Sequence, residues 1–158
     1  MKVEGSDRYH LVFDARSYAV RSPSGMPHFE GRAAAKGPKI YVVSSRGVPV
    51  YVGVTKQAMS SRLRYGWKAK GRGGYYGYAW RHELSEAKLD IWYHLDPPEA
   101  NPMLDLETIE AEVVFLTRQT GQWPKCQTEI HFHSSARRHR AVARRIFDHY
   151  VCNRQQGQ

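Results

Sequence analysis

Four side chains in this sequence have the chemistry needed to cleave a phosphodiester bond. Two phenols, Tyr41 and Tyr51, lie in short β-branched runs ten residues apart, Arg62 follows them, and Glu110 interrupts an apolar helical stripe. A guanidinium can donate two N–H bonds to a phosphate and oppose the charge of the transition state. A carboxylate beside an apolar stripe is costly unless a cation pairs with it, and Mg²⁺ or Mn²⁺ suits that position. We therefore predict a hydrolytic site in which Tyr41 orients or deprotonates the attacking water.

Each of these residues also has a purely structural interpretation. A strand tyrosine is commonly half-buried packing, and Arg62 beside Arg64 could be a solvated helix arginine. Glu110 could pair with an arginine at the protein surface. Glu107 and Glu112 are rival metal ligands on the same helix, and we expect both to be more exposed than Glu110. The set of four, rather than any single member, favours the chemical interpretation.

The two tyrosine runs predict a β-hairpin. The connector Ser45-Arg46-Gly47 ends in the glycine that three-residue loops with a bulge prefer. If Ser44 and Val48 close this loop, Tyr41 lies opposite Tyr51. Strand alternation then places Tyr41, Val43, Tyr51 and Gly53 on one face. The other face carries the aliphatic residues Ile40, Val42, Val50, Val52 and Val54.

The remaining elements follow from hydrophobic periodicity and from breaks at glycine, proline and serine. We expect helices over 58–68, 78–87 and 104–120, a strand over 89–94, an extended passage over 126–132, and a last helix capped by Ser134 or Ser135 that runs to Tyr150. These elements predict an α+β domain with a small central antiparallel three-stranded sheet flanked by helices. Residues 1–37 read as an irregular arm, in which Tyr9–Phe13 could form a strand. Residues 38–133 form the core, and residues 134–158 add a basic C-terminal helix and tail packed on the core.

The charge balance predicts a polyanionic partner. The chain carries 24 Lys and Arg against 15 Asp and Glu, with a net charge of +9 and a pI near 9.7. Two basic segments are candidates for nucleic-acid binding: a glycine-rich segment over 68–78, expected to be a mobile loop, and the last helix. A flexible surface loop and an ordinary solvated helix face are the alternatives. The candidate contacts are Lys68, Lys70, Arg72, Tyr75, Tyr76, Arg137, Arg138, Arg140 and Arg144.

Size and cysteine content narrow the class of protein. A chain of 158 residues and 18.2 kDa fits one domain with a modest core. Cys126 and Cys152 are too few for a disulfide framework and predict reduced thiols. With no secretory pattern and no long apolar stretch, we expect a soluble cytosolic protein. His131 and His133 alternate along the chain but have no third zinc ligand nearby.

The ordered set of motifs resembles the GIY-YIG nuclease family over roughly residues 38–133. Lysine replaces glycine in the first triplet, and Gln127 stands near the position where an asparagine is usual. The matching segments are Lys39-Ile40-Tyr41, Tyr51-Val52-Gly53, Arg62-Leu63, Glu110-Ala111 and the passage 123–132.

This resemblance implies a restriction-like endonuclease that hydrolyses DNA with one Mg²⁺ or Mn²⁺ ion, acting as a homodimer on double-stranded DNA. It implies that Glu110 holds the ion, that Tyr41 handles the water, and that Arg62 and Tyr51 grip the phosphate. Supporting positions are Gly53, Lys56, Arg64 and Gln127. A repair or mobile-element nuclease remains an alternative, as does a nucleic-acid-binding protein that has kept the fold and lost cleavage.

Overall fold

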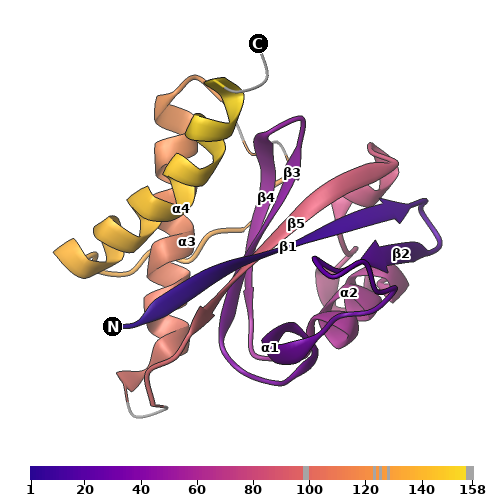
Figure 1. Cartoon of the computed structure of the whole chain (residues 1–158), viewed down its shortest axis with the longest axis horizontal. Coiled ribbons are helices and arrows are strands. Elements are labelled where there is room, and N and C mark those ends of the chain that lie inside the picture. The colour runs from indigo at the N-terminus through magenta and orange to yellow at the C-terminus, as the bar shows by residue number, and fades with distance from the viewer. Residues whose placement is uncertain (98–99, 123, 125, 128, 156–158) are drawn as a thin grey trace.

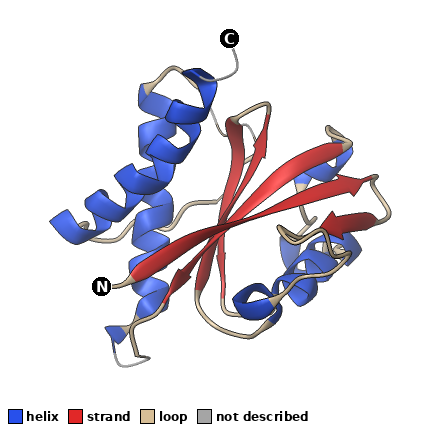
Figure 2. Cartoon of the chain, in the orientation of Figure 1, coloured by secondary structure: helices blue, strands red, loops and turns tan. Residues whose placement is uncertain are grey.

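An antiparallel sheet with helices on both faces forms the centre of the molecule (Figure 1, Figure 2). The computed structural model describes residues 1–97, 100–122, 124, 126–127 and 129–155. Five strands run in the order β2-β1-β5-β3-β4: β1 (Val3–Phe13), β2 (Tyr18–Arg21), β3 (Lys39–Ser45), β4 (Val48–Thr55) and β5 (Glu86–His94). The α-helices are α1 (Gly31–Ala34), α2 (Met59–Lys68), α3 (Pro102–Gln119) and α4 (Arg137–Gln155), with 3₁₀ turns η1 (Arg72–Gly74) and η2 (Ala79–His82). The α+β class is therefore confirmed.

The prediction of a three-stranded sheet with an irregular arm over 1–37 is wrong. β1 pairs with β5 from Val3↔His94 to Val12↔Glu86, and β2 pairs with β1. Tyr9, Leu11 and Phe13 point alternately into the core and are buried. The intervening positions are polar or exposed, so the segment looked too hydrophilic for a core strand. A register shift between Gly5 and Asp7 further breaks its alternation.

The β3–β4 hairpin forms, but with a tighter turn than predicted. Ser45 pairs with Val48, and Arg46 and Gly47 form a two-residue loop with φ values of 52° and 74°. Positive φ at both positions is typical of the type I′ turn, which matches the twist of paired strands. With this turn and a register shift between Val43 and Ser44, Tyr41 lies opposite Gly53 and Tyr51 lies opposite Val43. The predicted Tyr41–Tyr51 pair is therefore wrong.

Both faces of the hairpin are buried, and the predicted division of residues between them holds except at one position. Tyr41, Val43 and Tyr51 pack in the core layer with Met59 and Leu63 of α2. Ile40, Val42, Val52 and Val54 pack in the other layer with α3 and α4. Val50 joins the tyrosine layer because the register shifts beside it, between Val43 and Ser44.

The last helix is part of the core rather than a surface appendage. Tyr150 donates a hydrogen bond to Asp90 Oδ2 on β5 at 2.9 Å, and His139 Nε2 lies 2.7 Å from Asp105 Oδ1 on α3. Ala143, Ile146 and Phe147 pack against the apolar stripe of α3. Among the described helices, none combines the length and apolar character needed to cross a bilayer.

Two of the predicted helices agree closely with the observed ones, one observed helix is shorter than predicted and one is longer. The helices predicted over 58–68 and 104–120 are confirmed within two residues as α2 and α3. The helix predicted over 78–87 is only the 3₁₀ turn η2, because β5 already begins at Glu86. The last helix begins at Arg137 and continues to Gln155.

The passage predicted to be extended over 126–132 forms no strand in its described residues, although Cys126 N–H donates to Val50 O at 3.1 Å along β4. The side chain of Cys126 is buried. Residues 123, 125 and 128 of the matching motif, and residues 156–158 of the predicted tail, lie outside the described residues.

The role of β1 can be tested with two adjacent residues on opposite faces. Leu11 is fully buried and Val12 is 54% exposed. We expect Leu11→Ala to lower the free energy of unfolding by about 2–5 kcal/mol because it opens a cavity in the core. Val12→Ala should change it by about 0.5 kcal/mol or less. Chemical denaturation measures both, and equal effects would contradict the assignment of β1 to the sheet.

Candidate active site

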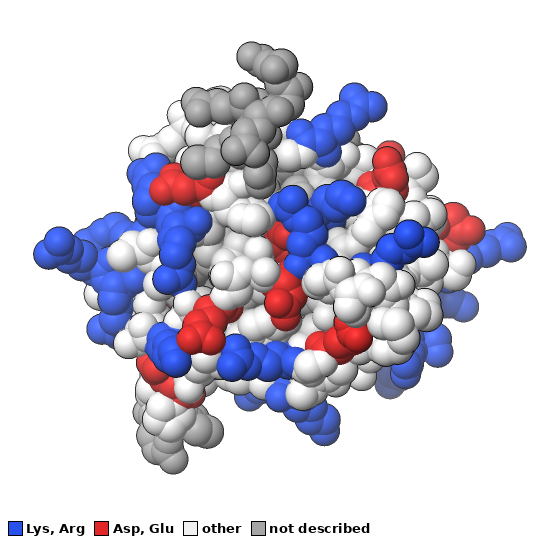
Figure 3. Space-filling model, viewed as in Figure 1, with Lys and Arg blue, Asp and Glu red and all other residues white. Residues whose placement is uncertain are grey.

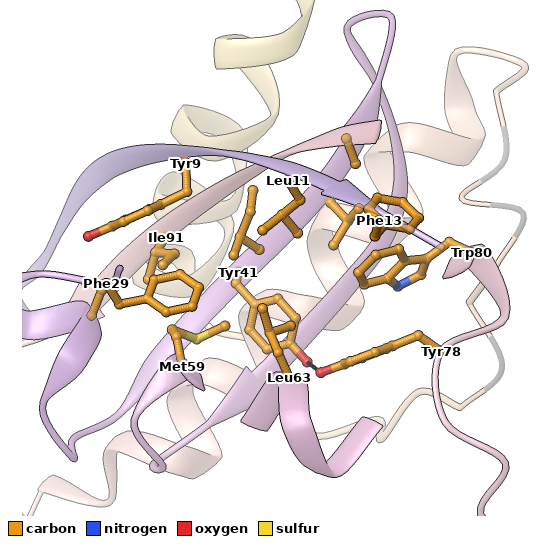
Figure 4. Packing of buried hydrophobic residues seen from close by; sticks show 14 of the residues in the cluster. Tyr9, Leu11, Phe13, Phe29, Tyr41, Met59, Leu63, Tyr78, Trp80 and Ile91 are labelled. Atoms are coloured by element: carbon orange, nitrogen blue, oxygen red, sulfur yellow. Dashed lines mark hydrogen bonds between the residues drawn. The ribbon is translucent and has the colours of Figure 1, made fainter. Parts of the chain in front are cut away.

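The phenols of β3 and β4 meet a third tyrosine that the sequence did not single out. Tyr41 is fully buried, and its hydroxyl lies 3.0 Å from that of Tyr78 (Figure 4). The ring of Tyr51 lies 6.0 Å from that of Tyr41 and 5.5 Å from that of Tyr78, between centroids. Tyr78 stands at the end of the glycine-rich segment, where no periodic pattern assigned it a face. Three phenols therefore converge on one face of the hairpin.

Gly53 explains how the phenols reach each other. A Cβ at this position would lie 2.6 Å from the Tyr41 hydroxyl and 2.8 Å from the Tyr51 ring. Because Tyr41 lies directly across from Gly53 in the register, its ring folds over the bare backbone. The glycine of the second triplet is therefore required by packing.

Arg62 on α2 faces the same cluster. Its guanidinium donates to the Tyr75 hydroxyl at 3.0 Å and lies 5.2 Å from the Tyr78 ring centroid. The rings of Tyr65 and Tyr75 lie 5.9 and 5.8 Å away. Cations over aromatic faces are attracted by the ring quadrupole. Arg62 is thus enclosed by rings and is not the solvated helix arginine of the alternative interpretation.

Burial keeps the phenols neutral. It raises the pKa of Tyr41 well above its ordinary value, and Tyr78 raises it further, whereas the nearby Arg62 lowers it. Burial also raises the pKa of Tyr51 well above the ordinary value. Of the two predicted roles for Tyr41, this environment suits a hydroxyl that orients a water rather than a phenolate that deprotonates it.

The helix that carries Glu110 lies on the opposite face of the sheet from the tyrosines. This helix, α3, packs on the aliphatic layer, and Glu110 is only 6% exposed. Burial raises its pKa to about 8, and the negative charge of Glu107 adds to this, while Gln127 and Arg62 lower it. Glu110 in turn raises the pKa of Tyr51. The acid and the guanidinium therefore interact through space, although no hydrogen bond or ion pair joins them within the described residues.

The rival acids have the exposure predicted for them. Glu107 and Glu112 are both more exposed than Glu110. Glu107 is also engaged, since its Oε2 lies 2.7 Å from His133 Nε2. His131 lies 3.2 Å from Glu129 in the same way. Glu110 is therefore the buried one of these three glutamates, and the other buried acid of α3, Asp105, is engaged by His94 and His139.

Gln127 closes the free edge of β4 beside Glu110. Its side-chain oxygen accepts from Val52 N–H at 2.9 Å, and its amide donates to Val52 O at 3.0 Å. The amide thus satisfies both backbone groups that an edge strand leaves open. This side chain, which the sequence resemblance places near an asparagine position, thus joins Gln127 to the edge of β4.

The glycine-rich segment is packed rather than free. Buried Arg81 donates to Gly66 O and Trp67 O at 2.5 and 2.6 Å, at the end of α2, and to Tyr76 O at 3.3 Å. Gly66 is overlaid by the Tyr78 ring, which a Cβ there would meet at 2.1 Å. These contacts, together with η1, replace the mobile loop that the composition predicted over 68–78.

The candidate nucleic-acid contacts fall into two groups. The first group lies in or beside the segment that covers Arg62 and comprises Lys68, Lys70, Arg72, Tyr75 and Tyr76. Lys56 and Arg64 are exposed and lie close to Arg62 in sequence. The arginines of α4 lie on the α3–α4 side, and Figure 3 shows blue side chains gathered where α4 begins. All four predicted arginines are exposed: Arg137, Arg138, Arg140 and Arg144.

Lys39, which replaces the glycine of the first family triplet, has a structural role. Its Nζ donates to Ala35 O and Gly37 O at 2.8 Å and to Gln57 O at 2.9 Å. Burial lowers its pKa to about 8. The ammonium therefore ties the loops that precede β3 and follow β4.

The residues present fit a metal bound through one protein carboxylate. Among the described residues, no group of three or more His, Cys, Asp or Glu side chains gathers into a metal-ligating cluster. Glu110 is nevertheless a buried acid without an ion-pair partner among those residues, and burial disfavours its charged form. A hard divalent ion that keeps several waters and takes one carboxylate would offset that cost.

Comparison of the chain with models of protein families, with curated proteins and with solved structures returned no match.

The packing of Gly53 gives a direct test of the phenol cluster. Gly53→Ala places a methyl group inside contact distance of two rings, so Tyr41 or Tyr51 must move. We expect a loss of about 1–3 kcal/mol in the free energy of unfolding, as for an overpacked core. Denaturation measures this loss. The matched control is Gly73→Ala, where a Cβ meets nothing within 4 Å and only the positive φ is strained. A neutral Gly53→Ala would contradict the packing.

Glu110 should make stability depend on pH and on metal. A pKa raised from 4.5 to about 8 means that its stabilising contribution is complete below pH 4.5 and is lost as the pH rises to about 8. Glu110→Gln cannot ionise, so we expect the variant to exceed the wild type by a few kcal/mol, about 1.4 per pKa unit, at pH 8–9 but not at pH 4.5.

Added Mg²⁺ or Mn²⁺ should raise the melting temperature of the wild type at pH 8 and leave that of Glu110→Gln unchanged. Glu112→Gln, on the same helix, is the matched control for both measurements. A metal response that survives Glu110→Gln would remove Glu110 from the metal site.

Proposed function

We propose that this protein is a divalent-metal-dependent endonuclease of the GIY-YIG type that hydrolyses DNA. The observation that carries the proposal is the convergence of Tyr41, Tyr51 and Arg62 on one face of the β3–β4 hairpin. Glu110 lies within electrostatic reach at the β4 edge. The four residues come from four different elements, and no requirement of packing alone would bring a guanidinium among buried phenols.

The proposed chemistry divides among these side chains by their charge. Arg62, a cation at neutral pH, binds the scissile phosphate and opposes the charge that builds on it. Tyr51, half-buried at the rim, donates a hydrogen bond to the same phosphate. Tyr41, kept neutral by burial, orients the attacking water through its hydroxyl. Glu110 would hold a Mg²⁺ or Mn²⁺ ion, which when bound supplies Lewis-acid stabilisation of the departing oxygen.

Finer features of the proposal rest on the sequence resemblance. The resemblance over 123–132 favours a restriction-like enzyme acting as a homodimer on double-stranded DNA, with repair or mobile-element nucleases as variants of the same chemistry. The exposed arginines of α4 and the basic segment over 68–72 are the proposed contacts with the DNA backbone.

A second candidate is a nucleic-acid-binding protein that has lost cleavage. The observation that favours it is the closed state of the site, in which Tyr41 is fully buried and a guanidinium N–H of Arg62 is engaged by Tyr75. A phosphate would have to compete with the Tyr75 hydroxyl for that N–H of Arg62. Salt-dependent DNA binding without metal-dependent nicking would support this candidate.

Digestion of mixed unmethylated DNA tests the proposed activity. With Mg²⁺ or Mn²⁺, the wild type should cut, whereas Glu110→Gln should bind DNA with unchanged affinity and cut at least about 10²-fold more slowly because the ion is lost. Arg62→Lys should also lose about 10²-fold, since lysine cannot donate in bidentate fashion.

The control for both variants is Glu112→Gln, which should cut like the wild type. Sequencing of the ends then distinguishes discrete sites, expected of a restriction-like enzyme, from scattered cleavage. Full activity of Glu110→Gln would remove the acid from its proposed role.

A further inference from the structure

A cavity lies beside Arg62, next to the phenol cluster. It has a volume of about 600 Å³, and its lining includes Tyr65, Tyr75, Lys68, Lys70, Arg72 and Gly73. Ligand sites in proteins commonly measure about 300–1,000 Å³. The cavity therefore has the size of a small-ligand site, and its lining combines aromatic rings with three cations.

The two rings of this cavity are stacked on each other, and we call the pair the platform. The ring centroids of Tyr65 and Tyr75 are 5.0 Å apart and their planes are inclined by 10°, so a further planar group would stack on an outer face of the pair. Tyr65 is 58% exposed, so this aromatic side chain faces solvent on a helix whose other large apolar side chains, Met59, Leu63 and Trp67, are buried. A planar π system can stack on such a surface irrespective of its identity, as nucleobases stack on aromatic side chains.

The platform contacts Arg62, the proposed phosphate ligand. The Arg62 guanidinium lies 5.9 and 5.8 Å from the two ring centroids and donates to the Tyr75 hydroxyl. A base stacked on the platform would therefore belong to a nucleotide next to the phosphate held by Arg62. The ammonium groups of Lys68 and Lys70 stand on the same rim and suit the phosphates that flank that nucleotide.

The segment that carries Tyr75 is positioned in advance. Arg81 joins the end of α2 to the backbone of this segment through four carbonyl oxygens, those of Gly66, Trp67, Ala69 and Tyr76. Gly77 packs against the backbone of Gly66, where a Cβ would lie 2.0 Å from the carbonyl oxygen. A preorganised surface loses less freedom on binding than a mobile loop does.

We infer that the Tyr65–Tyr75 platform is a binding site for an unpaired nucleobase adjacent to the scissile phosphate. The substrate class is then DNA with an extruded or unpaired base at the cleavage position, because a base stacked within a regular duplex cannot present its face to these rings. This inference rests on the proposed function for the nature of its ligand, a nucleic acid.

The experiment measures binding rather than cleavage. Fluorescence anisotropy with the Glu110→Gln protein, without metal, compares three labelled duplexes of one sequence: fully paired, with a single bulged adenine, and with an abasic residue at the bulge. The adenine bulge should bind about tenfold tighter than the abasic bulge, since stacking on an aromatic side chain is worth about 5- to 150-fold per base. Both bulged duplexes carry the same backbone charge and the same bulged position, so the comparison reports the base.

Variants of the platform separate stacking from other effects. Tyr65→Ala and Tyr75→Ala should abolish the difference between adenine and abasic bulges, whereas Tyr65→Phe and Tyr75→Phe, which keep the rings, should preserve it. Phe115→Ala is the matched control. This aromatic side chain is 54% exposed on α3 and does not line the cavity.

Equal affinity for the adenine and abasic bulges would overturn the inference, as would a loss of the preference in Phe115→Ala as large as that in Tyr65→Ala. The proposed hydrolysis is tested separately. If the wild-type protein prefers the adenine bulge but cuts none of these duplexes with Mg²⁺ or Mn²⁺, the hydrolysis is rejected and the base site is retained. Metal-dependent cutting without any preference for the base would reject the base site alone.

Discussion

The position of β4 at the edge of the sheet is the constraint on which the candidate site depends. One side of β4 pairs with β3, and the other leaves backbone groups open. Pro49, which has no N–H to donate, is tolerated on such a strand. The open edge allows Gln127 to bond both backbone groups of Val52, and Gln127 also lowers the pKa of Glu110. Helix α3 itself packs on the aliphatic face of the sheet, opposite the tyrosines.

The charges at this edge are arranged asymmetrically. Tyr41 and Tyr51 are neutral, and Glu110, with a pKa of about 8, is mostly protonated at neutral pH. Arg62 is then the principal charge among the four residues, which suits the phosphate of the proposed function. An ion held by Glu110, as we propose, would have to displace its proton, so its binding should become stronger as the pH rises. The proposed phosphate binding by Arg62 has no such proton to displace.

The sequence predicted what local patterns determine. Helices α2 and α3 were found because their apolar residues recur with helical spacing, and the faces of the hairpin follow from alternation even though the register was wrong. A shift of two residues preserves the faces, so Tyr41 kept its side of the sheet while its partner changed from Tyr51 to Gly53. Strand β1 was not predicted as part of the sheet, because a long strand with one polar face and a break at Gly5 lacks a continuous apolar run. Its partner β5 lies more than 70 residues further along the chain, which no local window can sample.

The parts of the site that the sequence did not predict all depend on contacts between distant segments. Tyr78 and Arg81 lie in the segment 78–87, which was predicted as a helix, and their roles appear only when Gly66 allows the Tyr78 ring to lie on α2. Arg81 then caps the end of that helix and fixes the backbone that carries Tyr75. Two glycines, Gly53 and Gly66, therefore act in the same way: each removes a Cβ so that a tyrosine ring can lie on bare backbone. Helix α2 carries both Arg62 and Gly66. The same helix therefore supplies the guanidinium and positions the Tyr78 ring beside it, so Arg62 and Tyr78 cannot move independently.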